Sequence, residues 1–382
     1  MKLATDFCKF AQELYPKEKV VLHRPLFEGR ELEYVTTCIN SNFVSSVGQM
    51  VVDFECAVSD FTGATYAIAC VNGTTALHAC LYCLGVDSES HVLTQALSFV
   101  ATSNAIAHCS AEPIFIDVDL DTMGMSSVAL EDWLCENTYT NDGVTFYKLT
   151  GKPIKACVPM HTFGLPARIE KILEICDAYY IPLIEDAAES LGSFVTNKHT
   201  GTFGSFGTFS FNGNKIITTG GGGMIITESE MLARKVKHLT TTAKVPHSFE
   251  FFHDAIGFNY RMPNLNAALG LAQIERLSDI LDYKKKLHEQ YVDFFSSRGI
   301  EIAKSQAGDT SNNWLNAIIL RNKSERDKFL HVTNSAEVMT RPVWALLSTL
   351  PMYKHCPNDG LKNSKWLADR VVNIPSSVST LR

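Results

Sequence analysis

The chain has 382 residues and a formal net charge of −7, with 46% hydrophobic and 20% charged residues. This length predicts two domains, or one large domain with an appendage, and the composition is that of a globular enzyme. The acidic balance and the lack of a basic run argue against nucleic-acid binding. The N-terminus lacks a signal peptide's apolar core, and no apolar run reaches about 18 residues. We therefore expect no membrane span and a cytoplasmic location.

Eleven cysteines are scattered along the chain without the paired spacing of a metal site. Cys80 and Cys83 form a CxxC pair, but they fall inside an apolar helical pattern, and no second pair completes a zinc site. We interpret them as small buried hydrophobic residues and expect no metal. An odd number of cysteines without a disulfide framework favours a reducing compartment.

The first 62 residues predict a helical segment, with an amphipathic helix at the start and helices near 28–39 and 50–61. Apolar strands then alternate with helical stretches. The expected strands are 66–71, 91–94, 113–118, 155–160 and 181–184, and the expected helices are 74–84, 100–108, 127–136 and 168–179. This alternation predicts an α/β fold with a mostly parallel sheet covered on both faces.

From residue 264 onward the pattern becomes long and helical and leads into a smaller α+β region. There we expect strands near 314–320 and 338–343 and helices near 325–332 and 364–371. The sequence therefore predicts a large domain over residues 1–285 and a smaller C-terminal domain over residues 286–382.

One lysine is isolated from other charges. Lys215 is the single formal charge between His199 and Thr227, within a stretch rich in glycine, aromatic and hydroxyl residues. A solvated face usually carries several charges, so this pattern favours a buried amine, which would serve as a nucleophile that forms a Schiff base. The alternative is a lysine whose stem packs on Phe209 or Phe211 while its head reaches water. Composition alone leaves both open.

Two predicted strands end in residues suited to a ligand, and ligands of open α/β sheets bind at the carboxyl ends of strands. Thr74 and Thr75 open a helix after a glycine turn, where free N–H groups favour a phosphate; ordinary helix capping is the alternative. Glu185 and Asp186 end another strand and point to opposite faces, so at most one enters a site. Its partner could be a protonated pyridine nitrogen, as in pyridoxal phosphate enzymes, or it could cap the following turn.

Two common nucleotide motifs are absent from the sequence. The glycines before Lys215 have the wrong spacing for a phosphate-binding loop, and Ile216 stands where Ser or Thr is required. No GxGxxG follows the first strand. A nucleotide hydrolase and a nicotinamide dehydrogenase are therefore disfavoured.

The order of anion cradle, strand-end carboxylate and isolated lysine resembles the DegT/StrS group of sugar-nucleotide aminotransferases, which are fold-type I pyridoxal phosphate enzymes. The resemblance covers nearly the whole chain. It implies a homodimer with shared active sites, in which Lys215 forms the Schiff base and moves protons. The other cofactor-binding residues that it implies are Thr74, Thr75, Phe99 (stacking on the ring), Asp186 (pairing with the ring nitrogen), Glu189, Ser210 and Asn259 (reaching the neighbouring subunit's phosphate).

The resemblance also bears on the substrate. Segments 158–164, 238–247, 314–318 and 339–344 are closest to enzymes that act on UDP-2-acetamido-4-keto-6-deoxy sugars, with glutamate as amino donor, for bacterial surface glycans such as lipopolysaccharide. His161 and Arg341 are candidate substrate neighbours, or else a satisfied strand-end histidine and a surface arginine. One branch of the family has histidine at the position of Lys215 and dehydrates its substrate, so lysine favours transamination. A sugar dehydratase or deaminase and a cofactor-binding regulator remain the alternatives.

Overall fold

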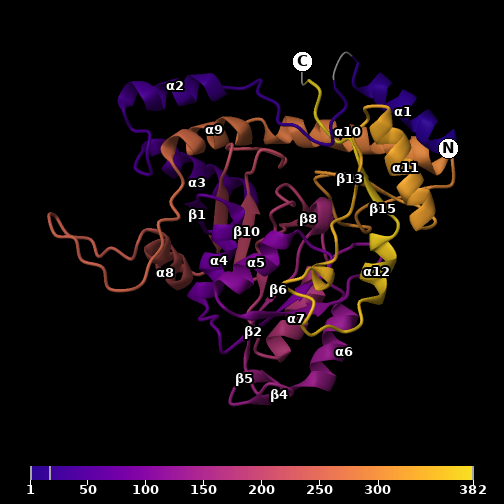
Figure 1. Ribbon diagram of the computed structural model, residues 1–382. Coiled ribbons are helices and arrows are strands. Elements are labelled where there is room, and N and C mark those ends of the chain that lie inside the picture. Colours follow the sequence, from indigo (N-terminus) through magenta and orange to yellow (C-terminus); the bar gives the residue numbers. More distant parts are fainter. Residues whose placement is uncertain (1, 17–18, 381–382) are drawn as a thin grey trace.

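The computed structural model describes residues 2–16 and 19–380 (Figure 1). Its main sheet combines a three-stranded and a four-stranded part, joined by parallel bridges from Cys157 to Leu183 and from Met160 to Asp186. The strand order is β3-β2-β6-β7-β10-β11-β1, and β11 alone runs in the direction opposite to the other strands of this sheet. These strands are β1 (Tyr66–Cys70), β2 (His91–Gln95), β3 (Glu112–Ile116), β6 (Ile154–Val158), β7 (Ile184–Asp186), β10 (Phe206–Ser210) and β11 (Gly223–Thr227).

Helices cover this sheet because its strands are buried on both faces, as the apolar runs predict. The helices between residues 31 and 274 are α2 (Glu31–Ser41), α3 (Gln49–Thr62), α4 (Gly73–Cys83), α5 (Val100–His108), α6 (Ser127–Asn137), α7 (Ile169–Ala178), α8 (Glu230–Thr240) and α9 (Asn264–Ile274). Two hairpins, β4 (Thr138–Asn141) with β5 (Val144–Tyr147) and β8 (Phe194–Val195) with β9 (Lys198–His199), extend from the connections. The predicted α/β class and mostly parallel sheet are confirmed.

The smaller region contains a separate antiparallel sheet of order β12-β13-β15-β14. Its elements are α10 (Leu277–Ser296), β12 (Glu301–Ile302), β13 (Asn316–Ile319), α11 (Lys323–Ser335), β14 (Arg341–Pro342), α12 (Lys362–Ala368) and β15 (Val371–Ile374). Helix α10 runs continuously across the expected boundary between residues 285 and 286.

The first helix packs with the smaller region. Phe7 and Ala11 of α1 (Lys2–Leu14) are buried with Tyr291 and Phe295 of α10 and Val372 of β15. Figure 1 shows α1 beside α11, close to the C-terminal elements. The apolar face of α1 is therefore covered by residues of the smaller region, and the expected domain division, with residues 1–62 in the large domain, stays a prediction.

Two further expectations concern membranes and cysteines. Within residues 2–16 and 19–380, no helix combines the length and the apolar character that crossing a bilayer requires. Cys80 and Cys83 are free and buried on α4, as small hydrophobic residues would be. Burial raises the pKa of both thiols, so they stay protonated.

Candidate active site

A cavity of about 560 Å³ lies where the large and smaller regions meet. The carboxyl ends of β7 and β10 and the N-terminus of α4 form one side, and residues around β13 and β14 form the other. Seven of the predicted site residues line it: Thr74, Phe99, Asp186, Glu189, Ser210, Lys215 and Arg341. Separate segments therefore converge on one hollow, as the strand-end argument predicts.

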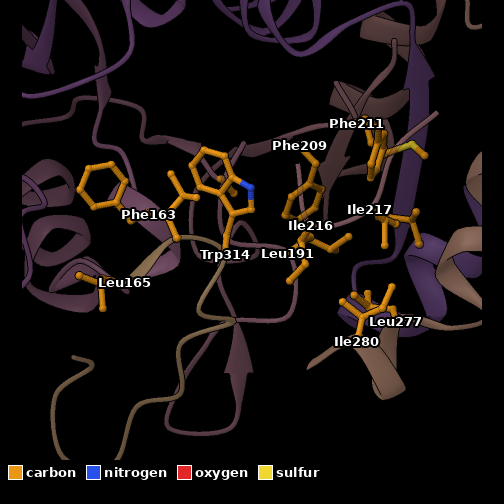
Figure 2. Close-up of a cluster of buried hydrophobic side chains, with 14 of the residues drawn as sticks. Phe163, Leu165, Leu191, Phe209, Phe211, Ile216, Ile217, Leu277, Ile280 and Trp314 are labelled. Carbon is orange, nitrogen blue, oxygen red and sulfur yellow. The ribbon is translucent and has the colours of Figure 1, made fainter. Parts of the chain in front are cut away.

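Lys215 is held with its amine in the cavity. The two residues after it, Ile216 and Ile217, are buried in the cluster that contains Phe209 and Phe211 (Figure 2). Its side chain is 11% exposed, and its Nζ donates to Oε1 of Glu189 at 3.1 Å. The alternative of a lysine whose head extends into water is therefore wrong.

Glu189 is a buried carboxylate between Lys215 and the backbone. Its Oε2 accepts a hydrogen bond from the Phe163 N–H at 2.9 Å. Burial raises the pKa of Glu189 above its ordinary value, and the positive charge of Lys215 opposes that rise. Because a buried carboxylate needs a partner, Glu189 fixes where the amine rests when nothing else binds it.

The two adjacent carboxylates of β7 point to opposite sides, as their spacing predicts. Asp186 lines the cavity, and its Oδ2 accepts from Thr102 Oγ1 at 2.7 Å. Glu185 is fully buried behind it and accepts backbone N–H groups of Gly201 at 2.7 Å and Phe203 at 2.6 Å. Asp186 is thus the carboxylate available to a ligand, and Glu185 organises the loop before β10.

The N-terminus of α4 offers an anion site beside Ser210. Asn72 caps the helix by accepting from Thr75 N at 2.9 Å. Among the described residues, the N–H groups of Gly73 and Thr74 have no hydrogen-bond partner, and both residues line the cavity. A Cβ on Gly73 would lie 2.9 Å from Ser210 Cβ, so glycine keeps this approach open. Free N–H groups at a positive helix end suit a phosphate.

Three predicted site residues lie outside the cavity of their own chain. Thr75 Oγ1 donates to Asn72 O at 2.9 Å, within the first turn of α4. Asn259 is exposed, and its Oδ1 accepts from Arg261. His161 is fully buried, 3.0 Å from Glu185 and accepting Ala167 N–H at 3.1 Å. The expectation that His161 lies beside the substrate is therefore corrected. Both nitrogens of its buried ring have partners inside the protein, as in a satisfied core histidine.

Sequence reasoning assigned no role to Trp314 and Trp344, which line the cavity from the smaller region. The Lys215 Nζ lies 4.3 Å from the centre of the Trp314 ring, and Trp314 Nε1 donates to Asn214 O at 2.7 Å. Trp344 contacts Phe99 edge-on, with 6.3 Å between ring centres. Their signal in sequence is weak, because a buried aromatic looks the same in a core as in a site.

Comparison with known proteins decides the family. The family model of the DegT/DnrJ/EryC1/StrS aminotransferases matches residues 26–381. The chain belongs to this aminotransferase family. A relative from Bacillus subtilis (strain 168), EpsN, assigned as a pyridoxal phosphate-dependent aminotransferase, is 36% identical over 88% of this chain and 84% of its own length. The aminotransferase is thus a pyridoxal phosphate enzyme, and the predicted family, activity and cofactor are confirmed.

Other relatives cover the aminotransferase almost completely. A GDP-perosamine synthase of Escherichia coli O157:H7 is 34% identical over 94% of this chain and 93% of its own length. A crystal structure of a DegT/DnrJ/EryC1/StrS aminotransferase from Brucella abortus superposes with a TM-score of 0.81 at 25% identity, covering 91% of this chain and 90% of that one. The aminotransferase TlmJ from Streptoalloteichus hindustanus superposes with a TM-score of 0.85 at 24% identity, over 94% of both chains.

The cavity fits pyridoxal phosphate on features of this structure. The N-terminus of α4, which begins with Gly73, suits its phosphate, and the buried carboxylate of Asp186 suits a protonated ring nitrogen. Lys215 supplies an amine in the same cavity. When bound, the cofactor supplies the electron sink for amino transfer.

We predict that Trp314→Leu lowers kcat of the aminotransferase about tenfold, because the Trp314 ring lies 4.3 Å from the Lys215 Nζ and helps to position this amine, and about 1.4 kcal/mol of lost positioning is tenfold. Trp314→Phe keeps an aromatic face and should recover most of that loss. Steady-state kinetics at saturating substrate measure both variants. Trp366→Leu is the matched control, since its ring carries Arg370 at 4.4 Å outside the cavity. Equal losses in the Leu and Phe variants would contradict the prediction.

Proposed function

We propose that this enzyme transfers the amino group of an amino acid, L-glutamate in first place, to a nucleotide-linked 4-keto-6-deoxy sugar. The observation that carries the proposal is the convergence of Lys215, Glu189 and Asp186 on one cavity beside an anion-binding helix end. Lys215 holds the cofactor covalently and moves a proton at its Nζ, with Glu189 next to that amine. Asp186, Thr74, Ser210 and Phe99 line the same cavity. With the cofactor bound, Asp186 would pair with the ring nitrogen, Thr74 and Ser210 would hold the phosphate, and Phe99 would cover the ring.

The smaller region supplies the side of the cavity that faces a sugar nucleotide. Arg341 lines it from β14, and its Nη1 donates to Asn334 Oδ1 at 2.8 Å, which holds the guanidinium at the cavity wall. An arginine there suits a diphosphate, since its donors match phosphate oxygens. Arg341 is also exposed, so a substrate role and a surface arginine both stay open.

The nucleotide part of the acceptor substrate could be UDP or GDP. The sequence segments named above favour UDP-2-acetamido-4-keto-6-deoxyhexose. Relatives from Caulobacter vibrioides, Escherichia coli O157:H7 and Vibrio cholerae, 32%, 34% and 32% identical, are named GDP-perosamine synthases and favour a GDP-linked acceptor. A role in surface-glycan or lipopolysaccharide synthesis and a cytoplasmic location remain predictions.

Product identification tests this proposal. The purified enzyme is incubated with ¹⁵N-glutamate and each of a panel of UDP- and GDP-linked ketosugars, and the products are analysed by NMR. Transfer of ¹⁵N to carbon 4 of one sugar is the expected result. Consumption of a sugar without nitrogen transfer would favour a dehydratase or deaminase, and cofactor binding without turnover of any sugar would favour a regulator.

We further propose that the active enzyme is a homodimer. The segment between α8 and α9 projects from the body (Figure 1) and exposes Phe249, Phe251 and Ile256, each at least 77% exposed. Leu32 on α2 is 82% exposed. Apolar side chains exposed to this degree favour an interface with a second copy. Asn259 lies near the C-terminal end of this projecting segment. This position supports the prediction that its side chain reaches the active site of the neighbouring subunit.

Complementation between two inactive variants tests this sharing. Co-expressed Lys215→Ala and Asn259→Ala subunits should recover activity up to about a quarter of the wild-type rate, since half of random dimers are mixed and each contains one intact site. The control pairs Lys215→Ala with Asp186→Asn, two residues of the same cavity, and should recover nothing. No recovery in the first mixture would place Asn259 outside the partner's site.

A further inference from the structure

Three metal-ligating side chains meet far from the cavity, where the chain after β14 crosses the edge of the main sheet. Glu112 begins β3, the edge strand, and His355 and Cys356 lie between β14 and α12. A carboxylate oxygen, a ring nitrogen and the thiol sulfur of these residues lie within 4.8 Å of one another. Glu112 Oε1 and His355 Nε2 are 3.6 Å apart. Two ligands on one tetrahedral zinc ion are separated by roughly 3.3–3.8 Å, given bonds of about 2.0–2.3 Å.

The three side chains open onto a hollow of about 300 Å³. Cys356 is buried, with 4% of its surface exposed, whereas the His355 side chain is largely exposed and the Glu112 side chain partly exposed. A cation therefore has a path from solvent, with the thiol behind it and the imidazole and carboxylate at the entrance.

A fourth residue supplies an independent sign of a ligand. His91 is 1% exposed, and its Nδ1 has no hydrogen-bond partner among the described residues. That nitrogen faces Glu112 Oε2 at 3.6 Å, while its Nε2 is 2.9 Å from Thr150 Oγ1. A buried polar atom without a partner is costly. A cation that drew Glu112 into one orientation would let His91 bond the second carboxylate oxygen, as residues behind metal ligands do.

The backbone around the cluster is fixed before any cation binds. Phe115 of β3 donates its N–H to Pro357 O at 2.9 Å. Tyr353 Oη donates to Asn104 Oδ1 of α5 at 2.7 Å. These contacts hold the segment on both sides of His355 and Cys356, so little ordering remains for binding to accomplish.

We propose that Glu112, His355 and Cys356 bind a thiophilic divalent cation, with Zn²⁺ as the first candidate and water as the fourth ligand. One sulfur, one nitrogen and one oxygen make a borderline-soft ligand set that suits Zn²⁺ or Co²⁺ and not Mg²⁺ or Ca²⁺. The ion fastens the connection between β14 and α12 to the edge strand. It takes no part in amino transfer, because none of its ligands lines the cofactor cavity. The CxxC pair on α4 is not this site.

Cobalt titration of the chelator-treated, untagged, pyridoxal phosphate-loaded enzyme tests the proposal. One equivalent of Co²⁺ should produce the visible bands of a tetrahedral ion, at longer wavelength than the cofactor absorbs. Cys356→Ser should shift these bands, and His355→Ala should weaken binding at least tenfold. Cys135→Ser, which removes an exposed cysteine elsewhere, should change neither.

Thermal unfolding gives the second readout. Saturating Zn²⁺ should raise Tm of the wild type by about 2–4 °C and leave His355→Ala unchanged. His355 is largely exposed, so this variant folds even if a change at the buried Cys356 does not. Absence of tetrahedral cobalt bands, or equal binding by wild type and His355→Ala, would overturn the proposal. Binding abolished by Cys135→Ser would identify an adventitious site and overturn it as well.

Discussion

Lys215→Ala should lower amino transfer by at least about 10³-fold and leave the dialysed protein colourless. General acid–base catalysis by one side chain contributes about 10²–10⁴-fold, and this variant also removes the amine that we propose holds the cofactor. Borohydride reduction of the wild type should attach the cofactor to the peptide that contains Lys215, which mass spectrometry locates. The same treatment of the variant should attach nothing.

The matched control is Lys198→Ala. Lys198 is an exposed lysine on β9 whose Nζ lies over Phe203 and not in the cavity. It should retain wild-type absorbance and kcat. A coloured, active Lys215→Ala protein, or a borohydride adduct on another lysine, would contradict the assignment of Lys215.

The sequence predicted the large-domain side of the cavity because parallel strands end at the same edge. Asp186 ends β7, and Thr74 opens the helix that follows β1. Their meeting in one cavity follows from strand alternation and from crossover helices, both visible in residue patterns. The alternation also separated Asp186 from Glu185 correctly.

The two strands on either side of Lys215 in the sequence, β10 and β11, lack a strand pattern that the sequence analysis could detect. β10 and β11 consist largely of glycine, hydroxyl and mixed apolar residues, so their alternation is weak. A Cβ on Gly207 would lie 2.0 Å from Gly201 O. Gly207 therefore allows close packing of β10 against the backbone of Gly201, and this packing outweighs the poor strand propensity of glycine. A contact of this kind leaves no local pattern in the sequence.

The smaller region's side of the cavity depends on docking between distant segments. Trp314 reaches Lys215 across about a hundred positions of sequence, and no local period encodes that contact. For His161 the sequence left a substrate neighbour and a satisfied strand-end histidine open, and the contact of its buried ring with Glu185 favours the second. A position at a strand end predicts that a residue lies near the cavity. Its hydrogen-bond partners then decide whether its side chain faces the ligand.

Lys284→Met should remove a pH dependence from the enzyme's stability. Lys284 is fully buried on α10, and its Nζ donates to Ser376 O at 2.6 Å and to Trp314 O at 3.0 Å. Burial lowers the pKa of Lys284 from 10.5 to about 7. Below about pH 7 the folded state must therefore bury a protonated amine, which costs about 5 kcal/mol relative to an exposed lysine, and this cost falls as the pH rises.

The sign follows from proton counts. Between pH 7 and 10.5 the unfolded chain binds the proton of Lys284 and the folded chain does not, so its contribution to the free energy of unfolding rises with pH in this window. Below pH 7 both states are protonated and the contribution is flat. Urea unfolding at saturating cofactor, from pH 7 to 8.5, should give a slope in wild type that exceeds the slope in Lys284→Met by up to about 1.4 kcal/mol per pH unit.

The control for this difference lies on the same helix. Lys285 is exposed, so Lys285→Met should keep the wild-type slope. Methionine fills the volume of the lysine stem but leaves the carbonyls of Trp314 and Ser376 without their donor, which costs about 1–3 kcal/mol at every pH. Absolute stability and slope therefore separate the two roles of Lys284: a lower stability with an unchanged slope would show that it is protonated throughout and acts through hydrogen bonds alone.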